Sequence, residues 1–377
     1  MTSIIGAPDR YIQGPGEISR LHEYGSRLGS EFLVVAEEQT MATMHDAVEH
    51  AFEGTGTVLI YEEFSGICTG PEIDRLNTVC DLSSCDVVLG IGGGRAINAA
   101  RAVAATQQLP LMVVPTTAAT GAPCSSVSIL TDESGIFQEL RVYPVHPDLV
   151  VVDSAVIAQA PPRSLVSGMG NTIGTWLGAR ACSASDRPNL LGGRSSLSSA
   201  ALAKLGYDTI LADGLRALVA AQNGMPTRAF ERVLEASIYC SGMAFENGGC
   251  AAAHSVGNAL TLLPAAREQS HGELVAFGSI VQLILEDAPR EEMDAIMNLF
   301  LSTGLPMTLE ELGLGDAGRS SLQEVAAAAC AENNFMSAMP FAVTPDDVLG
   351  AILAASVTGH LYQEEDGEHA GHEEDEE

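Results

Sequence analysis

The first 155 residues alternate short apolar runs with stretches of helical pattern, and this alternation constrains the fold more than any other feature. The apolar runs are Phe32–Ala36, Val58–Tyr61, Val87–Ile91, Leu111–Val114 and Leu149–Val152. Helical patterns separate the first four runs. Apolar runs of strand length that are joined by helices are typical of parallel strands buried on both faces. The sequence therefore predicts an α/β half built on a parallel sheet, to which Ser125–Thr131 and Phe137–Tyr143 add a hairpin.

The pattern changes after Pro161, where strand signals become rare. Stretches rich in Ala and Leu, each of helical length, follow one another: Leu165–Ala184, Leu197–Asn223, Thr227–Phe245, Ala251–Leu263, Gly272–Asp287, Glu291–Ser302 and Leu322–Ala331. Gly and Pro residues punctuate them. We therefore expect two domains, an α/β domain over 1–158 and an all-helical domain over 159–362. The acidic, low-complexity residues 363–377 are predicted to be a disordered tail.

The charge of the chain excludes some classes of partner. It has 49 acidic and 18 basic residues, a formal net charge of −31, and Lys204 is the only lysine. So few cations do not readily form a basic patch, which argues against nucleic acid and against an anionic membrane surface as partners. Solubility in high salt and a compositional preference for Arg over Lys both fit this charge.

Several absences point to a cytoplasmic location. No run reaches the roughly 18 consecutive apolar residues of a membrane span. The first residues lack the basic region and apolar run of a secretory signal. The eight cysteines form no CxxC pair, so we expect reduced thiols.

Two loops that follow predicted strands have the composition of a nucleotide site. Glycines 92–94 stand between a strand and a helical stretch, where backbone N–H groups can receive a phosphate. Their spacing matches neither the dinucleotide fingerprint nor the P-loop, and a tight turn also needs glycine on steric grounds. The next strand leads into Pro115–Ser126, which is rich in hydroxyl groups and small residues. Because ligands of open α/β sheets bind outside the carboxyl ends of the strands, the two loops together predict a dinucleotide site.

Three further residues are candidates for binding. Glu37 ends an earlier strand, where a carboxylate suits a ribose diol and repels a 2′-phosphate, which favours NAD over NADP; a solvated loop acid is the alternative. His254 interrupts an Ala-rich helical stretch and His271 precedes Gly272-Glu273. Metal ligation would explain both histidines. Neither HExxH nor HxxxH is present, however, and spacing alone favours core or capping histidines.

Six blocks in a fixed order carry a family resemblance: Gly92–Arg95, Pro115–Ser126, Pro147–Asp153, Gly168–Asn171, Gly248–Asn258 and Ser270–Gly278. Through them the chain resembles the glycerol dehydrogenase branch of the iron-containing (group III) alcohol dehydrogenases, from about residue 11 to residue 357. The resemblance implies a Rossmann-like domain followed by an all-helical domain, an architecture shared with dehydroquinate synthase. It also implies NAD-dependent oxidation of a secondary hydroxyl of glycerol, or of a related small polyol or alcohol, to the ketone. Zinc or another divalent metal, and a homo-oligomer, are implied as well.

The resemblance also assigns site residues. His254 and His271 fall on two of the three metal ligands and are the implied catalytic residues, which reverses the preference from spacing alone. Asn171 falls on the third ligand, and Gly121 on a position that contacts the substrate. The implied cofactor-binding residues are Glu37, Gly92, Gly93, Gly94, Arg95, Asn98, Thr116, Thr117, Ser125 and Val127.

The chain departs from the family pattern where the chemistry is expected. The family has aspartates where this chain has Asn98, Gly121 and Asn171, a lysine at Arg95 and a second histidine at Gly257. An amide in place of a ligating carboxylate predicts weaker metal binding. A hydrogen-bonding site without its acceptor discriminates less well for a hydroxylated substrate.

Two functions follow from this pattern. One is an NAD-dependent dehydrogenase of a small polyol or alcohol. The other is a catalytically impaired homologue that keeps the fold and the nucleotide site and acts as a binding or regulatory protein. A non-redox enzyme related to dehydroquinate synthase shares the fold but lacks the glycerol-dehydrogenase-like blocks.

Overall fold

The first half of the molecule is built on a parallel sheet of six strands. The computed structural model describes residues 2–374, with side chains up to residue 366. In spatial order the strands are β1 (Tyr11–Gly14), β8 (Leu149–Asp153), β5 (Leu111–Pro115), β4 (Val87–Gly92), β2 (Glu31–Glu37) and β3 (Val58–Phe64). Each predicted apolar run lies in one of these strands, which confirms the predicted α/β fold. Strand β1 was not predicted, because it is a half-exposed edge strand of four residues without an apolar run.

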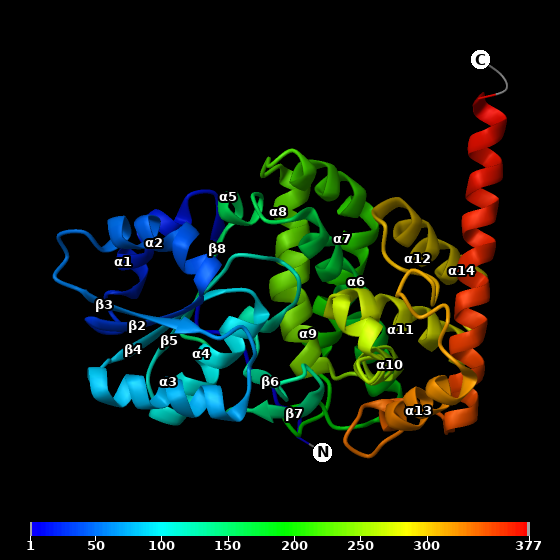
Figure 1. Cartoon of the computed structure of the whole chain (residues 1–377), viewed down its shortest axis with the longest axis horizontal. Coiled ribbons are helices and arrows are strands. Elements are labelled where there is room, and N and C mark those ends of the chain that lie inside the picture. The colour runs from blue at the N-terminus through cyan, green and yellow to red at the C-terminus, as the bar shows by residue number, and fades with distance from the viewer. Residues whose placement is uncertain (1, 375–377) are drawn as a thin grey trace.

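Helices cover both faces of the sheet (Figure 1). They are η1 (Glu17–Arg20), α1 (Leu21–Gly25), α2 (Glu38–Phe52), α3 (Gly70–Ser83), α4 (Gly94–Gln107) and α5 (Ser154–Ile157). Alternate residues of β2 enter different cores: Phe32 packs in one cluster with residues of α2, and Leu33 in the other with residues of α3 and α4. A parallel sheet needs this cover because its central strands are apolar on both sides. The short helix η2 (Ala122–Cys124) precedes the predicted hairpin, which is β6 (Val127–Thr131) paired with β7 (Phe137–Val142).

The second half consists of helices. They are α6 (Pro162–Ser185), α7 (Leu197–Gln222), α8 (Arg228–Glu235), the π-helical turn η3 (Ala236–Cys240), α9 (Ser241–Gly248), α10 (Ala252–Leu260), η4 (Pro264–Glu268), α11 (His271–Leu285), α12 (Arg290–Thr303), α13 (Arg319–Ala329), η5 (Met336–Ala338) and α14 (Pro345–Glu374). Figure 1 shows them beside the sheet, with α8 and α9 next to it and α14 at the far side. The exact limits of the two domains remain a prediction.

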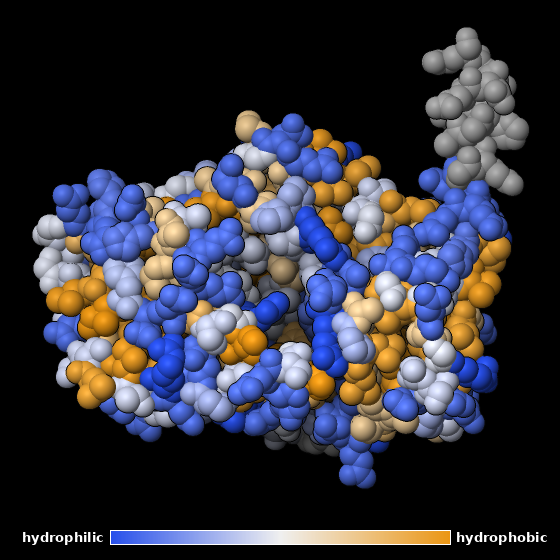
Figure 2. Space-filling view, viewed as in Figure 1, coloured by the Kyte–Doolittle hydropathy of each residue, from blue (hydrophilic) through white to orange (hydrophobic). Residues whose placement is uncertain are grey.

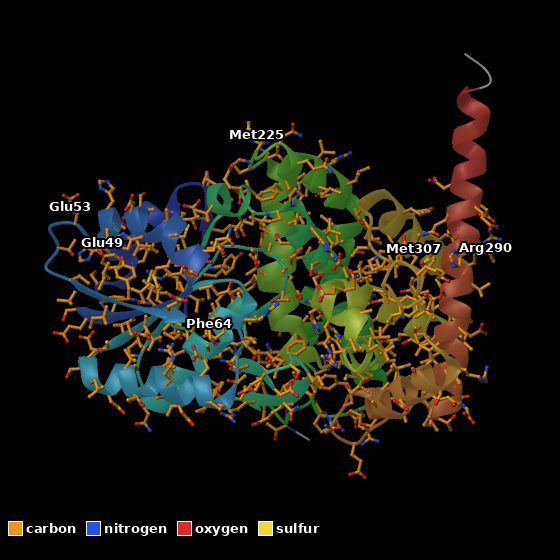
Figure 3. All side chains as sticks on the ribbon, viewed as in Figure 1. Glu49, Glu53, Phe64, Met225, Arg290 and Met307 are labelled. Atoms are coloured by element: carbon orange, nitrogen blue, oxygen red, sulfur yellow. The ribbon has the colours of Figure 1, made fainter. Side chains whose placement is uncertain are left out.

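One hydrophobic core joins the two halves. It extends from one face of the sheet through α4 into the helices around α11. Phe64 on β3 and Met307 after α12 both belong to it, although they lie in opposite halves (Figure 3). Because burial of apolar surface is the main stabilising contribution, a shared core fixes the position of one half against the other.

The end of the chain corrects one prediction. Helix α14 continues to Glu374, so residues 363–374 are helical rather than disordered, and residues 375–377 lie outside the described part. Val348, Ile352 and Ala355 are buried and anchor the helix. Adding residues to a helix that has already nucleated costs little, which outweighs the acidic composition of this segment. Within residues 2–374, no helix has the length and apolar character that crossing a membrane requires.

Asp153 at the end of β8 joins the start of the chain to the sheet. Its buried carboxylate accepts hydrogen bonds from the backbone N–H groups of Gly16 (3.0 Å), Ile18 (2.9 Å), Ala155 (2.9 Å) and Val156 (3.3 Å). Hydrogen bonds to an ionised acceptor are the strong kind, and an unpaired buried N–H group is costly.

We therefore predict that Asp153→Ala lowers the free energy of unfolding by about 3 kcal/mol. Asp81→Ala, which removes an exposed carboxylate from α3, is the matched control and should leave stability unchanged. Urea unfolding followed by circular dichroism measures both variants. Equal stability of the two variants would show that Asp153 does not hold this turn.

Candidate functional site

The glycine loop places the N-terminus of α4 at the carboxyl edge of the sheet. Strand β4 ends at Gly92, whose φ of 142° is a conformation that side chains rarely adopt. Gly93 precedes α4 with extended backbone and provides no side-chain cap. In the part of the chain that the structure describes, the N-cap of α4 therefore gives no side-chain acceptor to the first N–H groups, and such an end attracts anions. The exposed side chain of Arg95 lies beside this loop and donates to the carbonyl of Gly66 at 3.3 Å.

The loop after β5 packs directly against the glycine loop. The N–H of Thr116 donates to the carbonyl of Gly92 at 3.0 Å. A Cβ atom on Gly93 would lie 3.7 Å from Oγ1 of Thr117, so the two loops are in van der Waals contact. Glu37 ends β2, which neighbours β4 in the sheet. The structure thus brings together the glycines and both threonines of the predicted dinucleotide site, and it places Glu37 at the end of a neighbouring strand.

Three predicted cofactor residues lie beneath this surface. Asn98 is buried on α4, and its side-chain oxygen accepts a hydrogen bond from Nη1 of Arg101 at 3.0 Å. Ser125 and Val127 are also buried, and the N–H of Val127 donates to Oγ of Ser125 at 3.3 Å. The contacts of these residues shape the loop from below.

His254 has an environment that calls for a ligand. It stands in the first turn of α10, its exposed fraction is 1%, and neither ring nitrogen has a hydrogen-bond partner among the described residues. Buried polar atoms are nearly always paired, so two unpaired nitrogens need an explanation. Burial and the neighbouring His271 lower the pKa of His254 to about 3. At neutral pH the ring is therefore uncharged and has a free lone pair.

His271 lies next to His254 at the start of α11. The centroids of the two rings are 5.9 Å apart. The helix is fixed at this end by a capping box between Ser270 and Glu273, and Glu273 also accepts from Nε of Arg163 at 2.7 Å. The His271 side chain is exposed. Desolvation lowers its pKa too, but solvent reaches this ring, so we expect a smaller decrease than at His254.

Asn171 lies on α6, which packs against the two helices that carry His254 and His271. Its neighbours on the helix make the contact: a Cβ on Gly170 would be 2.5 Å from the carbonyl of Gly272, and one on Gly174 would be 3.5 Å from Cβ of Ala253. Nδ2 of Asn171 donates to Oγ of Ser241 at 3.0 Å. Its carboxamide oxygen accepts no hydrogen bond from the described residues, which leaves this oxygen free to bind a ligand.

These groups fit a divalent metal with a neutral ligand set. Within the described residues, no three His, Cys, Asp or Glu side chains are grouped closely enough to hold a metal. Two imidazoles and one amide oxygen remain as donors, and the unpaired nitrogens of His254 are the observation that fits a metal. Imidazole binds zinc well, whereas an amide oxygen adds no negative charge to the site.

Two glycines stand where the family resemblance expects side chains. A Cβ on Gly121 would lie 2.3 Å from the backbone nitrogen of Gly242 on α9. A Cβ on Gly257 would lie 3.1 Å from Cγ2 of Val275 on α11. In this structure neighbouring helices occupy the space that the missing side chains would need. Figure 2 shows the surface hollowed where the two halves meet.

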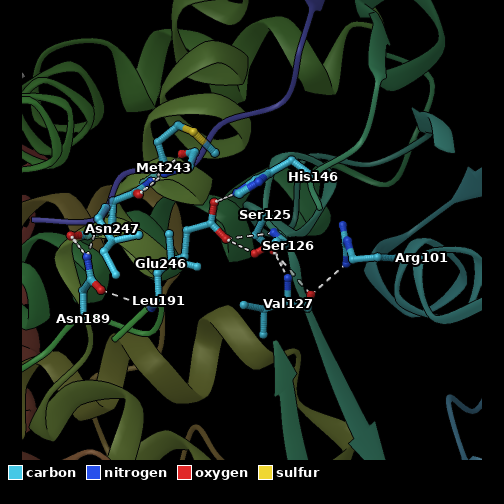
Figure 4. A network of polar contacts seen from close by, with 12 residues as sticks. Arg101, Ser125, Ser126, Val127, His146, Asn189, Leu191, Met243, Glu246 and Asn247 are labelled. Atoms are coloured by element: carbon cyan, nitrogen blue, oxygen red, sulfur yellow. Dashed lines mark hydrogen bonds and ion pairs between the residues drawn. The ribbon is translucent and has the colours of Figure 1, made fainter. Parts of the chain in front are cut away.

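The polar groups of α9 and α4 that support the site are not predicted by the sequence pattern. Figure 4 shows Glu246 pointing from α9 to Ser126 and His146, and Arg101 donating to the carbonyl of Val127. Nothing in the local pattern separates these residues from ordinary helix residues. For Arg101 one signal was available: it is a charged residue within a stretch of mostly small and apolar residues, 96–105.

Comparison with known proteins identifies the family. The family model for iron-containing alcohol dehydrogenase matches residues 8–154. A glycerol dehydrogenase from Citrobacter freundii is 40% identical over 362 residues, 96% of this chain and 99% of that protein. A glycolaldehyde reductase from Halobacterium salinarum is 36% identical, over 97% of this chain and 100% of that protein.

Solved structures agree with the sequence relatives. The crystal structure of glycerol dehydrogenase from Schizosaccharomyces pombe superimposes with a TM-score of 0.93 at 31% identity, over 97% of this chain and 93% of that one. The likeness extends through both halves, so it includes the helices that carry the histidine pair. The chain therefore belongs to the glycerol dehydrogenase branch of the iron-containing alcohol dehydrogenases.

Proposed function

We propose that the protein is an NAD-dependent, metal-dependent dehydrogenase that oxidises a secondary hydroxyl of glycerol, or of a related small polyol or alcohol, to the ketone. The observation that carries this proposal is the buried His254, whose two ring nitrogens have no partner among the described residues. It lies next to His271 in the helical half, while the two loops that are predicted to bind a dinucleotide lie at the edge of the sheet. The relatives that share nearly the whole chain are named for this chemistry.

The metal that we propose is zinc, held by His254, His271 and the side-chain oxygen of Asn171. When bound, it would act as a Lewis acid that lowers the pKa of the substrate hydroxyl. The role of this chain is to keep the imidazole of His254 neutral through burial and to hold the Asn171 amide by its bond to Ser241. Because all three donors are neutral, we expect weaker metal binding than a carboxylate ligand would give.

NAD would lie across the carboxyl edge of the sheet. The free N–H groups at the start of α4 suit its pyrophosphate, and Glu37 suits a ribose diol while repelling the 2′-phosphate of NADP. Thr116 and Thr117 would lie on the nicotinamide side, and NAD, when bound, would supply the hydride acceptor for the oxidation. Arg95, exposed beside the glycine loop, would add a positive charge near the phosphates.

Recognition of the substrate is expected to be less selective than the family pattern implies. Gly121 supplies no carboxylate to a polyol hydroxyl, and α9 leaves no room for one. A site without that acceptor loses discrimination between substrates with and without the hydroxyl. We also propose, from the resemblance, that the protein is a cytoplasmic homo-oligomer; all eight of its cysteines are free thiols in the structure.

A catalytically impaired homologue is the second candidate. Asn171 and Gly121 favour it, because they remove two carboxylates from the metal and substrate positions together. In this form the protein would keep the nucleotide loops and act as a binding or regulatory protein.

Metal retention tests the proposed ligand set. We predict that Asn171→Asp raises the affinity for zinc at least about tenfold, because it adds a negative charge to two neutral imidazoles. Zinc-loaded wild type and variant are dialysed against metal-free buffer, and elemental analysis then gives zinc per chain. Asn223→Asp adds the same charge at an exposed position of the helical half and should bind zinc like the wild type. Equal retention in all three proteins would contradict a ligand at position 171.

Turnover separates the two candidate functions. We predict that the zinc-loaded wild type reduces NAD with glycerol or another member of a polyol and alcohol panel, followed by NADH absorbance. Turnover that appears only in Asn171→Asp would instead support the impaired homologue.

Gly121 gives a prediction about packing. Replacing it with Asp is expected to destabilise the protein by about 1–3 kcal/mol, because the new side chain meets the backbone of Gly242. Gly350→Asp introduces the same side chain at an exposed position of α14, where its Cβ meets no other described part of the molecule within 4 Å, and it should leave the thermal midpoint nearly unchanged. A Gly121→Asp variant that is as stable as this control and more selective for glycerol would contradict the prediction, because it would show that the packing against Gly242 leaves room for a carboxylate.

A further inference from the structure

We propose that Arg101 and Glu246 are positioning residues of the cofactor site, which hold residues 122–127 from opposite sides and set that segment relative to His254 and Asn171. The proposal rests on the proposed function, because Ser125 and Val127 of this segment are among the residues that the family resemblance assigns to NAD. The two residues come from different halves of the molecule: Arg101 lies on α4 and Glu246 on α9. Neither was among the residues that the family resemblance assigned.

Arg101 holds the segment at both of its ends. Its exposed fraction is 1%. Its Nη1 donates to the carbonyl of Val127 at 2.7 Å, and its Nη2 donates to the carbonyl of Ala122. A guanidinium presents several donors in one rigid plane, so it can fix two carbonyls at a set separation. Burial lowers the pKa of Arg101 to about 10, which leaves it charged at neutral pH.

Glu246 holds the same segment from the other side. Its side chain is fully buried, with an exposed fraction of 0%. Oε2 accepts from the backbone N–H of Ser126 at 2.8 Å and from its hydroxyl at 2.9 Å. Oε1 pairs with Nε2 of His146, on the chain between β7 and β8. Three groups of the α/β half are thus bound to one carboxylate of the helical half (Figure 4).

Helix α9 connects this carboxylate to the proposed metal site. Ser241 bonds to Asn171 at 3.0 Å, and the ring of Phe245 packs 5.7 Å from the ring of His254. Gly242, one turn before Glu246, meets Gly121. Residues four apart on a helix share a face, so one face of α9 contacts the metal residues and the adjacent face contacts the loop. A shift of that loop would therefore have to move α9 or break the Glu246 contacts.

Buried charges are a poor way to gain stability alone, because desolvation offsets most of their attraction. Their directional hydrogen bonds fix geometry, however, and small errors in the position of reacting groups reduce rates strongly. This argues for a role in placing the cofactor rather than only in folding.

Glu246→Gln tests the proposal, since it keeps the shape of the side chain and removes its charge. We expect the Kd for NADH, from fluorescence titration, to rise about tenfold. Hydrogen exchange measured by mass spectrometry should become faster in peptides covering residues 116–128. Asp213→Asn is the matched control: Asp213 is a buried carboxylate paired with Arg232 at 2.7 Å within the helical half, and its loss should change neither measurement.

Arg101 variants give a second test that a purely structural role would not pass. Arg101→Met should weaken NADH binding to a similar extent, and Arg101→Lys, which keeps the charge, should recover part of it. Unchanged NADH affinity and unchanged exchange over 116–128 in Glu246→Gln would overturn the proposal. If the wild type bound no NADH at all, the proposed function would fail, and the hydrogen exchange alone would still decide whether Glu246 and Arg101 hold the segment.

Discussion

The contact between α9 and the loop after β5 is the constraint on which both candidate sites depend. Gly121 and Gly242 approach so closely that a Cβ on the first would lie 2.3 Å from the backbone of the second. Close-packed interiors do not deform gradually, so this contact fixes the distance between the sheet edge and the helices. The cofactor loops on one side and the histidine pair on the other keep their separation because neither glycine leaves space for adjustment.

The sequence predicts those parts of the structure that depend on local pattern or on sheet topology. The run Val87–Ile91 predicts a strand because it is apolar throughout. Glycines 92–94, which follow this run, are expected near Thr116 because neighbouring parallel strands end at the same edge of the sheet. The proximity of His254 and His271 depends on how α10 and α11 cross, which periodicity does not encode. Here the family resemblance supplied what the residue pattern left open.

Other features could not be predicted from the sequence because they also depend on tertiary contacts. Glu246 looks like any helix residue, and only the tertiary contact with Ser126 shows its use. Strand β1 is stabilised by its pairing with β8 rather than by its own composition. The end of α14 is a different case, because its acidic composition predicted disorder. The helix instead continues to Glu374, since a helix that is already packed extends at little cost.

The net charge of −31 says little about the site, where negative charge is scarce. The proposed metal donors are neutral, and Asn98 replaces a family aspartate beside Arg101. Among the described residues, the guanidinium of Arg101 therefore bonds only to neutral oxygens. The charge of Glu246 in the other half counteracts the effect of burial on the pKa of Arg101. Salt screens exposed ion pairs far more than buried charges. In this chain the attraction that supports the cofactor loop thus extends across the junction of the two halves, and it keeps its strength at ionic strengths that would weaken the pairs on the acidic surface.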